Sequence, residues 1–370
     1  MPKAVTRLSL SLIIAAFFCV NALAQSGRVQ PKPTPSEAPI KVATEEIKLN
    51  VLAFDEDGKF VSDVAEQDLV ITENNILHQP SSVRRMPANV LIVMDAGGEL
   101  RWVKSLEQTR KVANELISSL KAEDSVAIIQ YSDKAEIVSE WTADKGEAMV
   151  AVGRTKFGRR SAFVKSLALA RDFFVKSAVD NKHLVLITDG TDSSSDYSTK
   201  LRALRSLLST DITVHVLSYT RMEATDIEPR TKMISKTPPP KAMPDEVAAG
   251  LPNGVRDVAR APKIGPTINL DRKLLKTMRA RKDDLEVSEE QLSELAANTN
   301  GEIIIPETKE EMIEKAAIVA RMIDSSYVVT YTPKIPLEET RTEREIVVTS
   351  KRPGLIVEAR RKLILGDGRR

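Results

Sequence analysis

The chain has 370 residues, of which 42% are hydrophobic and 29% are charged, and its formal net charge is +2. This composition supports a folded core and excludes global disorder, and the length favours two or more structural units. Aromatic residues make up only 4% of the chain, which argues against a base-stacking surface for single-stranded nucleic acid. The near-neutral total charge gives no general attraction to nucleic acid or to anionic membranes.

Residues 1–24 are predicted to be a secretory signal peptide. The basic start MPKAVTR precedes the apolar run LSLSLIIAAFFCV, and NALA before Gln25 resembles an A-x-A cleavage site. The apolar run is short for a bilayer span, and an uncleaved membrane anchor is the alternative. Cleavage also removes Cys19, the single cysteine. We therefore expect an exported protein, periplasmic or extracellular, with no disulfide and no integral membrane segment after cleavage.

Two short regions follow the signal peptide. Residues 25–44 are rich in proline and polar residues, which predicts an extended linker. Residues 45–87 are predicted to form an N-terminal β-rich segment, because EIKLNVLAF alternates in hydrophobicity and later turn residues separate it from further strands. The turn DEDG at 55–58 has only two carboxylates before its glycine, so a hairpin turn fits it better than a calcium loop.

Residues 88–220 alternate between strand and helix patterns, which predicts a mostly parallel sheet covered by helices on both faces. Residues 135–142 are the exception, because they resemble an antiparallel edge strand. The other expected strands are 90–96, 126–132, 182–189 and 212–219, and the expected helices are 100–120, 161–175 and 199–208.

Residues 221–287 interrupt this alternation. They contain 8 of the 19 prolines, with 14 basic and 10 acidic residues, which predicts a partly disordered basic insertion. A helix is expected near 270–283. It either packs its leucines on the domain or offers a basic amphipathic face to a partner or a membrane surface.

The alternation resumes in residues 288–326, which are expected to complete the α/β domain. A helix is predicted to start at Ser288, with a capping box formed with Gln291, and a short strand and a last helix at 308–324 follow. Residues 327–370 return to strand patterns. The fold class expected is therefore a doubly wound, mostly parallel α/β domain inserted in a smaller β-rich module built from both flanking segments.

The order of these motifs resembles a known family. The stretches KLNVLAFDEDGKFVSDVAEQDLVITENN, LITDGTDSSSDYS, LSELAANTNGEI and SSYVVTYTP are similar to secreted bacterial VWFA-related proteins, which carry a von Willebrand factor type A domain. The resemblance implies a metal-ion-dependent adhesion site at the carboxyl ends of the strands. In that family the site reads Asp-x-Ser-x-Ser, then a distant Thr, then an Asp, and it holds magnesium or manganese.

On this sequence the resemblance places the site at Asp95, Glu99, Ser161 and Asp189. Gly97 stands where the first ligand serine belongs and carries no side-chain oxygen, and Glu99 replaces the second serine. One interpretation is a degenerate Mg²⁺ or Mn²⁺ site in which Glu99 reaches the ion and waters replace the missing ligand.

A second interpretation of these positions is a metal-free site, with a guanidinium of Arg159 or Arg160 as the replacement cation. A third is that Asp95 and Asp189 only cap helices and loops. Asp192 in the polar loop after Asp189 is expected to cap a helix or to contribute to the rim of the site.

No catalytic constellation is visible in the sequence. GRTKFGRRS resembles a phosphate-binding loop but has Arg159 where lysine belongs, the three histidines lack metal-ligand spacing, and there is no G-x-S-x-G elbow. We therefore expect a non-enzymatic module that binds an unidentified protein partner through Arg159, Arg160 and Asp192 beside the degenerate site. The alternatives are a metal-free structural scaffold that binds through the β-module or the insertion and, less favoured, an enzyme.

Overall fold

The structure is a computed structural model that describes residues 46–98, 104–238, 248–261, 264–335 and 343–364. The expected signal peptide and linker lie outside these residues, as does Glu99. The described elements belong to one compact unit, Glu45–Arg370. Within the described ranges, no helix combines the length and the apolar character that crossing a bilayer requires.

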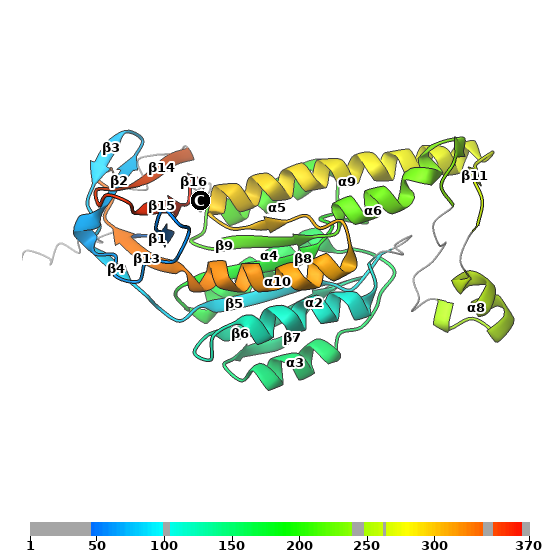
Figure 1. Cartoon of the computed structure of the whole chain (residues 1–370), viewed down its shortest axis with the longest axis horizontal. Helices are drawn as coiled ribbons and strands as arrows, with labels where there is room; N and C mark the ends of the chain where they lie inside the picture. The colour runs from blue at the N-terminus through cyan, green and yellow to red at the C-terminus, as the bar shows by residue number, and fades with distance from the viewer. Residues whose placement is uncertain (1–45, 99–103, 239–247, 262–263, 336–342, 365–370) are drawn as a thin grey trace, which may run out of the picture. The chain divides into compact units, whose positions relative to one another are not determined.

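A six-stranded sheet forms the centre of the α/β domain, in the order β12-β9-β8-β5-β6-β7 (Figure 1). Neighbouring strands are parallel except β6 and β7, which pair antiparallel, so the predicted edge strand and the predicted fold class are confirmed. The strands are β5 Asn89–Asp95, β6 Ser125–Tyr131, β7 Ala135–Thr142, β8 Lys182–Thr188, β9 Thr213–Ser218 and β12 Ile303–Ile304.

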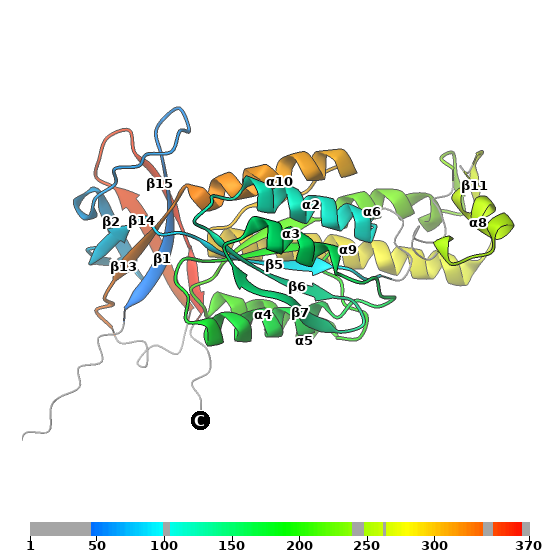
Figure 2. The same ribbon diagram turned by 90° about the horizontal axis from the view of Figure 1, so that it is seen from below.

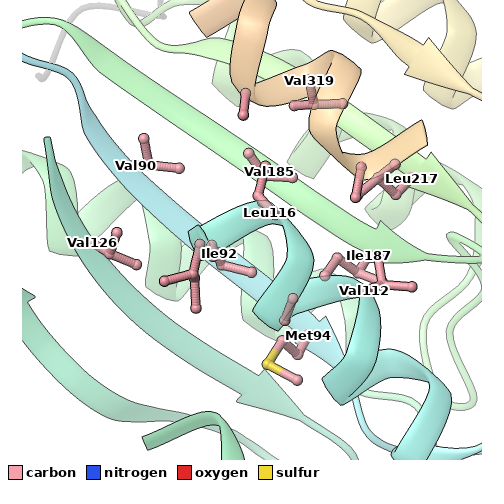
Figure 3. Packing of buried hydrophobic residues seen from close by; sticks show 14 of the residues in the cluster. Val90, Ile92, Met94, Val112, Leu116, Val126, Val185, Ile187, Leu217 and Val319 are labelled. Atoms are coloured by element: carbon pink, nitrogen blue, oxygen red, sulfur yellow. The ribbon is translucent and has the colours of Figure 1, made fainter. Parts of the chain in front are cut away.

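Helices cover both faces of this sheet (Figure 2). On one face, α2 (Leu106–Ser119), α3 (Lys145–Gly153) and α10 (Lys309–Asp324) bury their apolar sides against the strands. Figure 3 shows Leu116 of α2 and Val319 of α10 in one buried cluster with Ile92 and Val185 of the central strands. On the other face lie α4 (Phe163–Ser177), α5 (Tyr197–Leu208) and part of α9 (Arg272–Thr299).

The strands that flank the α/β domain in sequence form a β-rich module with its own apolar core. Two four-stranded sheets combine N-terminal and C-terminal strands, in the orders β15-β1-β13-β4 and β16-β14-β2-β3. The strands are β1 Ile47–Phe54, β2 Leu69–Glu73, β3 Ile76–His78, β4 Ser82–Arg84, β13 Ser326–Tyr331, β14 Glu343–Ser350, β15 Ile356–Ala359 and β16 Lys362–Ile364.

Two predictions about the region after β9 are wrong. The expected helices near 270–283 and from Ser288 are one continuous helix, α9, because no glycine or proline interrupts residues 272–299. Ser288 is a buried residue inside this helix, and its hydroxyl donates to the Asp284 carbonyl at 2.6 Å instead of capping a terminus. The described parts of the insertion also contain α6 (Thr220–Ile227), α8 (Asn253–Arg260), and a two-stranded ribbon of β10 (Ile234–Ser235) and β11 (Thr267–Ile268).

The first helix of the α/β domain starts later than expected. Its N-cap is Ser105, whose hydroxyl oxygen accepts from the Gln108 N–H at 3.1 Å. Lys104 therefore belongs to the loop between β5 and α2, directly before the cap. The sequence pattern also missed α3 entirely.

Candidate functional site

The candidate site lies where the strand order of the sheet reverses. From β5 the chain continues to β6 on one side, whereas β8 and β9 lie on the other side. Asp95 is the last residue of β5, and Asp189 directly follows β8, so both carboxylates reach the same carboxyl-terminal edge of the sheet. Such switch points are the usual binding crevices of open α/β sheets. Asp95 is 1% exposed and Asp189 is 0% exposed.

A lysine ammonium lies between these two carboxylates. Lys104 Nζ contacts Asp95 Oδ2 directly and lies 3.5 Å from Asp189 Oδ2. Lys104 is 3% exposed, and its Nζ also lies 6.0 Å from the centre of the Tyr219 ring. Burial in this environment raises the pKa of Tyr219, so its hydroxyl stays neutral and hydrogen-bonds Thr109 at 3.0 Å. Lys104 thus brings a positive charge to both aspartates from within the protein.

A second cation reaches Asp189 from α9. Arg281 Nη2 is 3.3 Å from Asp189 Oδ2 and donates to Glu223 Oε2 at 2.8 Å, while Nη1 donates to Thr191 Oγ1 at 2.8 Å. Thr191 in turn donates its hydroxyl and its backbone N–H to Asp189 Oδ1, both at 2.8 Å. The carboxylates are therefore surrounded by charge-assisted hydrogen bonds, which are stronger than neutral ones.

Lys200 of α5 adds a third buried cation on this side of the domain. Its Nζ donates to Ser288 Oγ at 2.7 Å. Burial lowers the pKa of Lys200, and the nearby Asp284, Asp189 and Asp192 oppose that effect. This hydrogen bond thus ties α5 to α9.

No side chain fits at position 97. A Cβ atom built on Gly97 would lie 2.0 Å from the Arg160 carbonyl oxygen and 2.9 Å from Ser132 Cα. The close approach arises because the loop after β5 pairs with the loop before α4: Gly158 N–H donates to the Ala96 carbonyl at 3.1 Å, and Gly98 N–H to the Gly158 carbonyl at 3.2 Å. The ligand serine of the adhesion-type pattern is therefore excluded by backbone, not merely absent from the sequence.

Ser161 lies at the same edge of the sheet and is held within the protein. Its hydroxyl donates to the Thr191 carbonyl at 2.7 Å, and its N–H donates to Ser193 Oγ at 2.8 Å. This serine therefore links the loop before α4 to the loop after β8. It is 1% exposed.

Asp192 has the capping role that the sequence allowed for it. Its oxygens accept from the N–H groups of Val164 at 2.8 Å, Ser194 at 2.8 Å and Ser195 at 2.8 Å. Burial raises its pKa, but these backbone donors outweigh that effect and leave the pKa of Asp192 below its usual value. The carboxylate therefore stays ionised and fixes the first turn of α4.

Arg159 and Arg160 occupy a different position from the one expected. Both are exposed, and among the described residues neither forms an ion pair with Asp95 or Asp189. The cations that lie beside these aspartates are Lys104 and Arg281 instead. Sequence reasoning missed Lys104 because it falls inside a predicted helix, and it missed Arg281 because 92 residues separate it from Asp189. The lysine just before an N-cap serine was the one available indication for Lys104.

The described residues do not fit a divalent ion well. Gly97 has no side-chain oxygen to act as a ligand, and the Lys104 ammonium already lies against both aspartates. No group of three or more His, Cys, Asp or Glu side chains with metal-binding geometry occurs among the described residues. A hard cation needs about six oxygen ligands and would have to displace the ammonium first.

Comparison with known proteins agrees with this architecture. Residues 90–191, from the start of β5 to the loop after β8, match the family model of the von Willebrand factor type A domain. An uncharacterized protein of Synechocystis sp. strain PCC 6803 is 28% identical over 139 residues, which are 37% of this chain. The match spans about a third of that relative's length, 33%.

Several solved structures show a distant likeness. One is an aerotolerance-related membrane protein from Bacteroides fragilis, at 16% identity and a TM-score of 0.39, covering 64% of this chain and 98% of that one. Another is a von Willebrand factor type A protein from Catenulispora acidiphila, at 13% identity and a TM-score of 0.41, covering 88% and 76%. A third is the manganese-loaded TRAP protein of Plasmodium vivax, at 8% identity and a TM-score of 0.36, covering 85% and 97%. The family assignment therefore holds for residues 90–191, which form a von Willebrand factor type A domain.

Proposed function

We propose that this chain is an exported, non-enzymatic protein-binding module that works without a bridging divalent ion. The observation that carries the proposal is the buried ammonium of Lys104 between Asp95 and Asp189. Its single positive charge lies against both carboxylates inside the protein, and Arg281 adds a second positive charge at Asp189, so the site keeps its shape without an external cation.

The partner surface in this proposal is the rim of the site rather than its centre. In an adhesion-type site the ion leaves one position open for an acidic group of the partner. Lys104 is 3% exposed, so its charge cannot reach a partner in the same way. Arg159 and Arg160 are exposed beside the Gly97–Gly158 bridge and provide two guanidinium groups at the same edge of the sheet. Arginine binds carboxylates in a bidentate manner, which favours an acidic partner surface.

The buried network supports this rim by fixing its loops. Asp192 caps α4, Ser161 joins two loops, and Arg281 holds Thr191 and Asp189 to α9. A surface whose loops are held by buried hydrogen bonds loses less conformational entropy on binding, which increases affinity. We assign Arg159 and Arg160 to the partner contact and Asp192 to the support of the rim.

Cross-linking and capture of the tagged, secreted chain would identify the partner, and affinity measurements with the purified partner would test the proposal. We expect Arg159→Ala/Arg160→Ala to weaken binding by about tenfold or more, as loss of interface arginines does. The matched control Arg202→Ala/Arg205→Ala, at exposed arginines of α5, should bind like wild type, and EDTA should have no effect. Binding that EDTA abolishes, or that both double variants retain, would overturn the proposal. Retention by both would favour the scaffold alternative.

The proposed export can be tested separately from partner binding. N-terminal sequencing of the protein recovered from outside the cytoplasm should begin at Gln25 if residues 1–24 are cleaved as a signal peptide. Recovery of the intact chain with the membrane fraction would instead support the uncleaved anchor.

A further inference from the structure

The β10–β11 ribbon exposes its apolar side chains and buries polar ones. Ile234 of β10 is directly opposite Ile268 of β11, so their side chains share one face of the ribbon. These isoleucines are 72% and 61% exposed, whereas Thr267 is 3% exposed and Asn269 is 9% exposed. A strand at a protein surface normally turns its apolar residues inward and its polar residues outward. Here the polar residues are inside and the apolar residues face solvent.

Hydrogen bonds fix this orientation. Asn269 Nδ2 donates to the carbonyls of Lys232 at 2.9 Å and Pro229 at 3.2 Å, and Thr267 Oγ1 donates to the Thr237 carbonyl at 2.8 Å. A shift of the register by one residue would bury the isoleucines but would break these bonds. The outward apolar face is therefore a property of the ribbon's own bonding.

Further apolar side chains surround the ribbon in sequence. We define the ribbon face as Met233, Ile234, Ile264, Ile268 and Leu270. Ile264 and Leu270 are 93% and 82% exposed, the highest values among the exposed large apolar residues of the described chain. The ribbon lies next to the N-terminal end of α9 (Figure 1). Concentrated exposure of this kind marks an interaction surface.

The charge around the ribbon face indicates what it contacts. The described residues 232–238 and 264–276 contain five lysines and arginines but only one aspartate. Asp271 is already occupied as the N-cap of α9, where its Oδ1 accepts from Lys273 N–H at 2.8 Å. Lys236, Arg272 and Lys273 are exposed and form no ion pair among the described residues. Protruding aliphatic side chains among unpaired cations are the combination that binds anionic lipid surfaces.

We infer that the ribbon face docks on an anionic membrane surface, with the aliphatic side chains entering the boundary between headgroups and acyl chains. Lys236, Arg272 and Lys273 contact the lipid phosphates. This contact is peripheral and reversible, because a few aliphatic side chains contribute far less than a spanning helix. The membrane contact uses different residues from the rim at Arg159 and Arg160, so its test is independent of the test of the proposed function.

Flotation of residues 25–370 with vesicles tests the inference. We expect binding to vesicles of phosphatidylglycerol and phosphatidylcholine, little binding to phosphatidylcholine alone, and weakening by salt. Ile234→Ser/Ile268→Ser should weaken binding by about tenfold or more, because both aliphatic side chains are lost. The control Val150→Ser/Val175→Ser removes two valines on α3 and α4 that are 60% and 68% exposed, and it should bind like wild type.

Three outcomes would overturn the inference. The first is no binding to anionic vesicles by a chain whose circular dichroism shows it to be folded. The second is equal binding by the ribbon variant and the control variant. The third is a concentration-dependent dimer in size-exclusion chromatography that only Ile234→Ser/Ile268→Ser dissociates, because the ribbon face would then bind a second copy of the chain.

Discussion

Lys104 Nζ contacts Asp95 Oδ2 inside the protein, where the two side chains are 2% and 0% exposed. A buried ion pair of this kind is costly to break, because removal of one partner leaves the other charge buried without compensation. The pair therefore ties the loop before α2 to the end of the central strand β5.

Replacement of this lysine tests its structural role. We expect Lys104→Met to lower the free energy of unfolding by about 3–5 kcal/mol, because Asp95 loses its buried counter-charge. The additional change Asp95→Asn should recover part of that loss. Urea denaturation measures both variants, and Lys111→Met, at an exposed lysine of α2, serves as the control. A loss no larger than that of the control would contradict the buried pairing.

A serine introduced at position 97, where the family has a ligand serine, should not create a metal site. In Gly97→Ser the new Cβ would meet the Arg160 carbonyl, so the loop before α4 must move. We expect a loss of about 1–3 kcal/mol in the free energy of unfolding, the usual cost of overpacking, and no gain of ion binding. Thermal unfolding with and without Mn²⁺ checks both expectations. Gly153→Ser is the control, because nothing lies within 4 Å of a Cβ at that position. A Gly97→Ser variant that is as stable as wild type and binds Mn²⁺ would show that the backbone accommodates a side chain at position 97.

Two buried histidines predict how stability depends on pH. The Glu302 N–H donates to His215 Nδ1 at 3.1 Å, so His215 donates from Nε2 to His183 Nδ1, also at 3.1 Å. Burial lowers the pKa of His215 to about 3 and, together with His215, lowers that of His183 well below its usual range. Between pH 6.5 and about 3 the unfolded chain binds protons that the folded chain does not, so stability falls as pH falls.

The expected size of this effect follows from the pKa difference. By pH 5, His215 alone should lower the free energy of unfolding by about 2 kcal/mol relative to pH 7. Burial raises the pKa of Asp226 to about 6, which acts with the opposite sign over part of this range. Urea midpoints are compared across pH for wild type and His215→Gln. The contribution of Asp226 is the same in both proteins and cancels in the difference. Equal pH slopes for the two proteins would contradict the account.

Arg360 connects the β-rich module to the α/β domain. Its guanidinium donates to the carbonyls of Thr210 and Leu207 at the end of α5, and the residue is 4% exposed. Burial lowers its pKa to about 10, which leaves it charged at neutral pH. We expect Arg360→Met to cost about 1–3 kcal/mol, because buried carbonyls lose their donors. Hydrogen exchange should show faster exchange at the end of α5. Protection there equal to wild type would contradict this role.

The sequence could predict the layers of the α/β domain and the meeting of Asp95, Asp189 and Ser161 at one edge of the sheet. Asp95 and Asp189 follow apolar strands that alternate with helices, and parallel strands bring their carboxyl ends to one edge. Ser161 is brought to that edge as well. Lys104 and Arg281 could not be placed, since one depends on where α2 begins and the other on the path of a 28-residue helix after a long insertion. The space at Gly97 depends on loop pairing that no local pattern encodes.

Calorimetric titration of Mn²⁺ into residues 25–370 tests whether Lys104 takes the place of a divalent ion. We expect no saturable binding to wild type at millimolar ion. We expect weak binding to Lys104→Ala, in which Asp95 loses the ammonium that contacts it, and none to Lys104→Ala/Asp95→Ala. Saturable binding of Mn²⁺ to wild type that Asp95→Ala abolishes would contradict the claim and restore a working adhesion-type metal site.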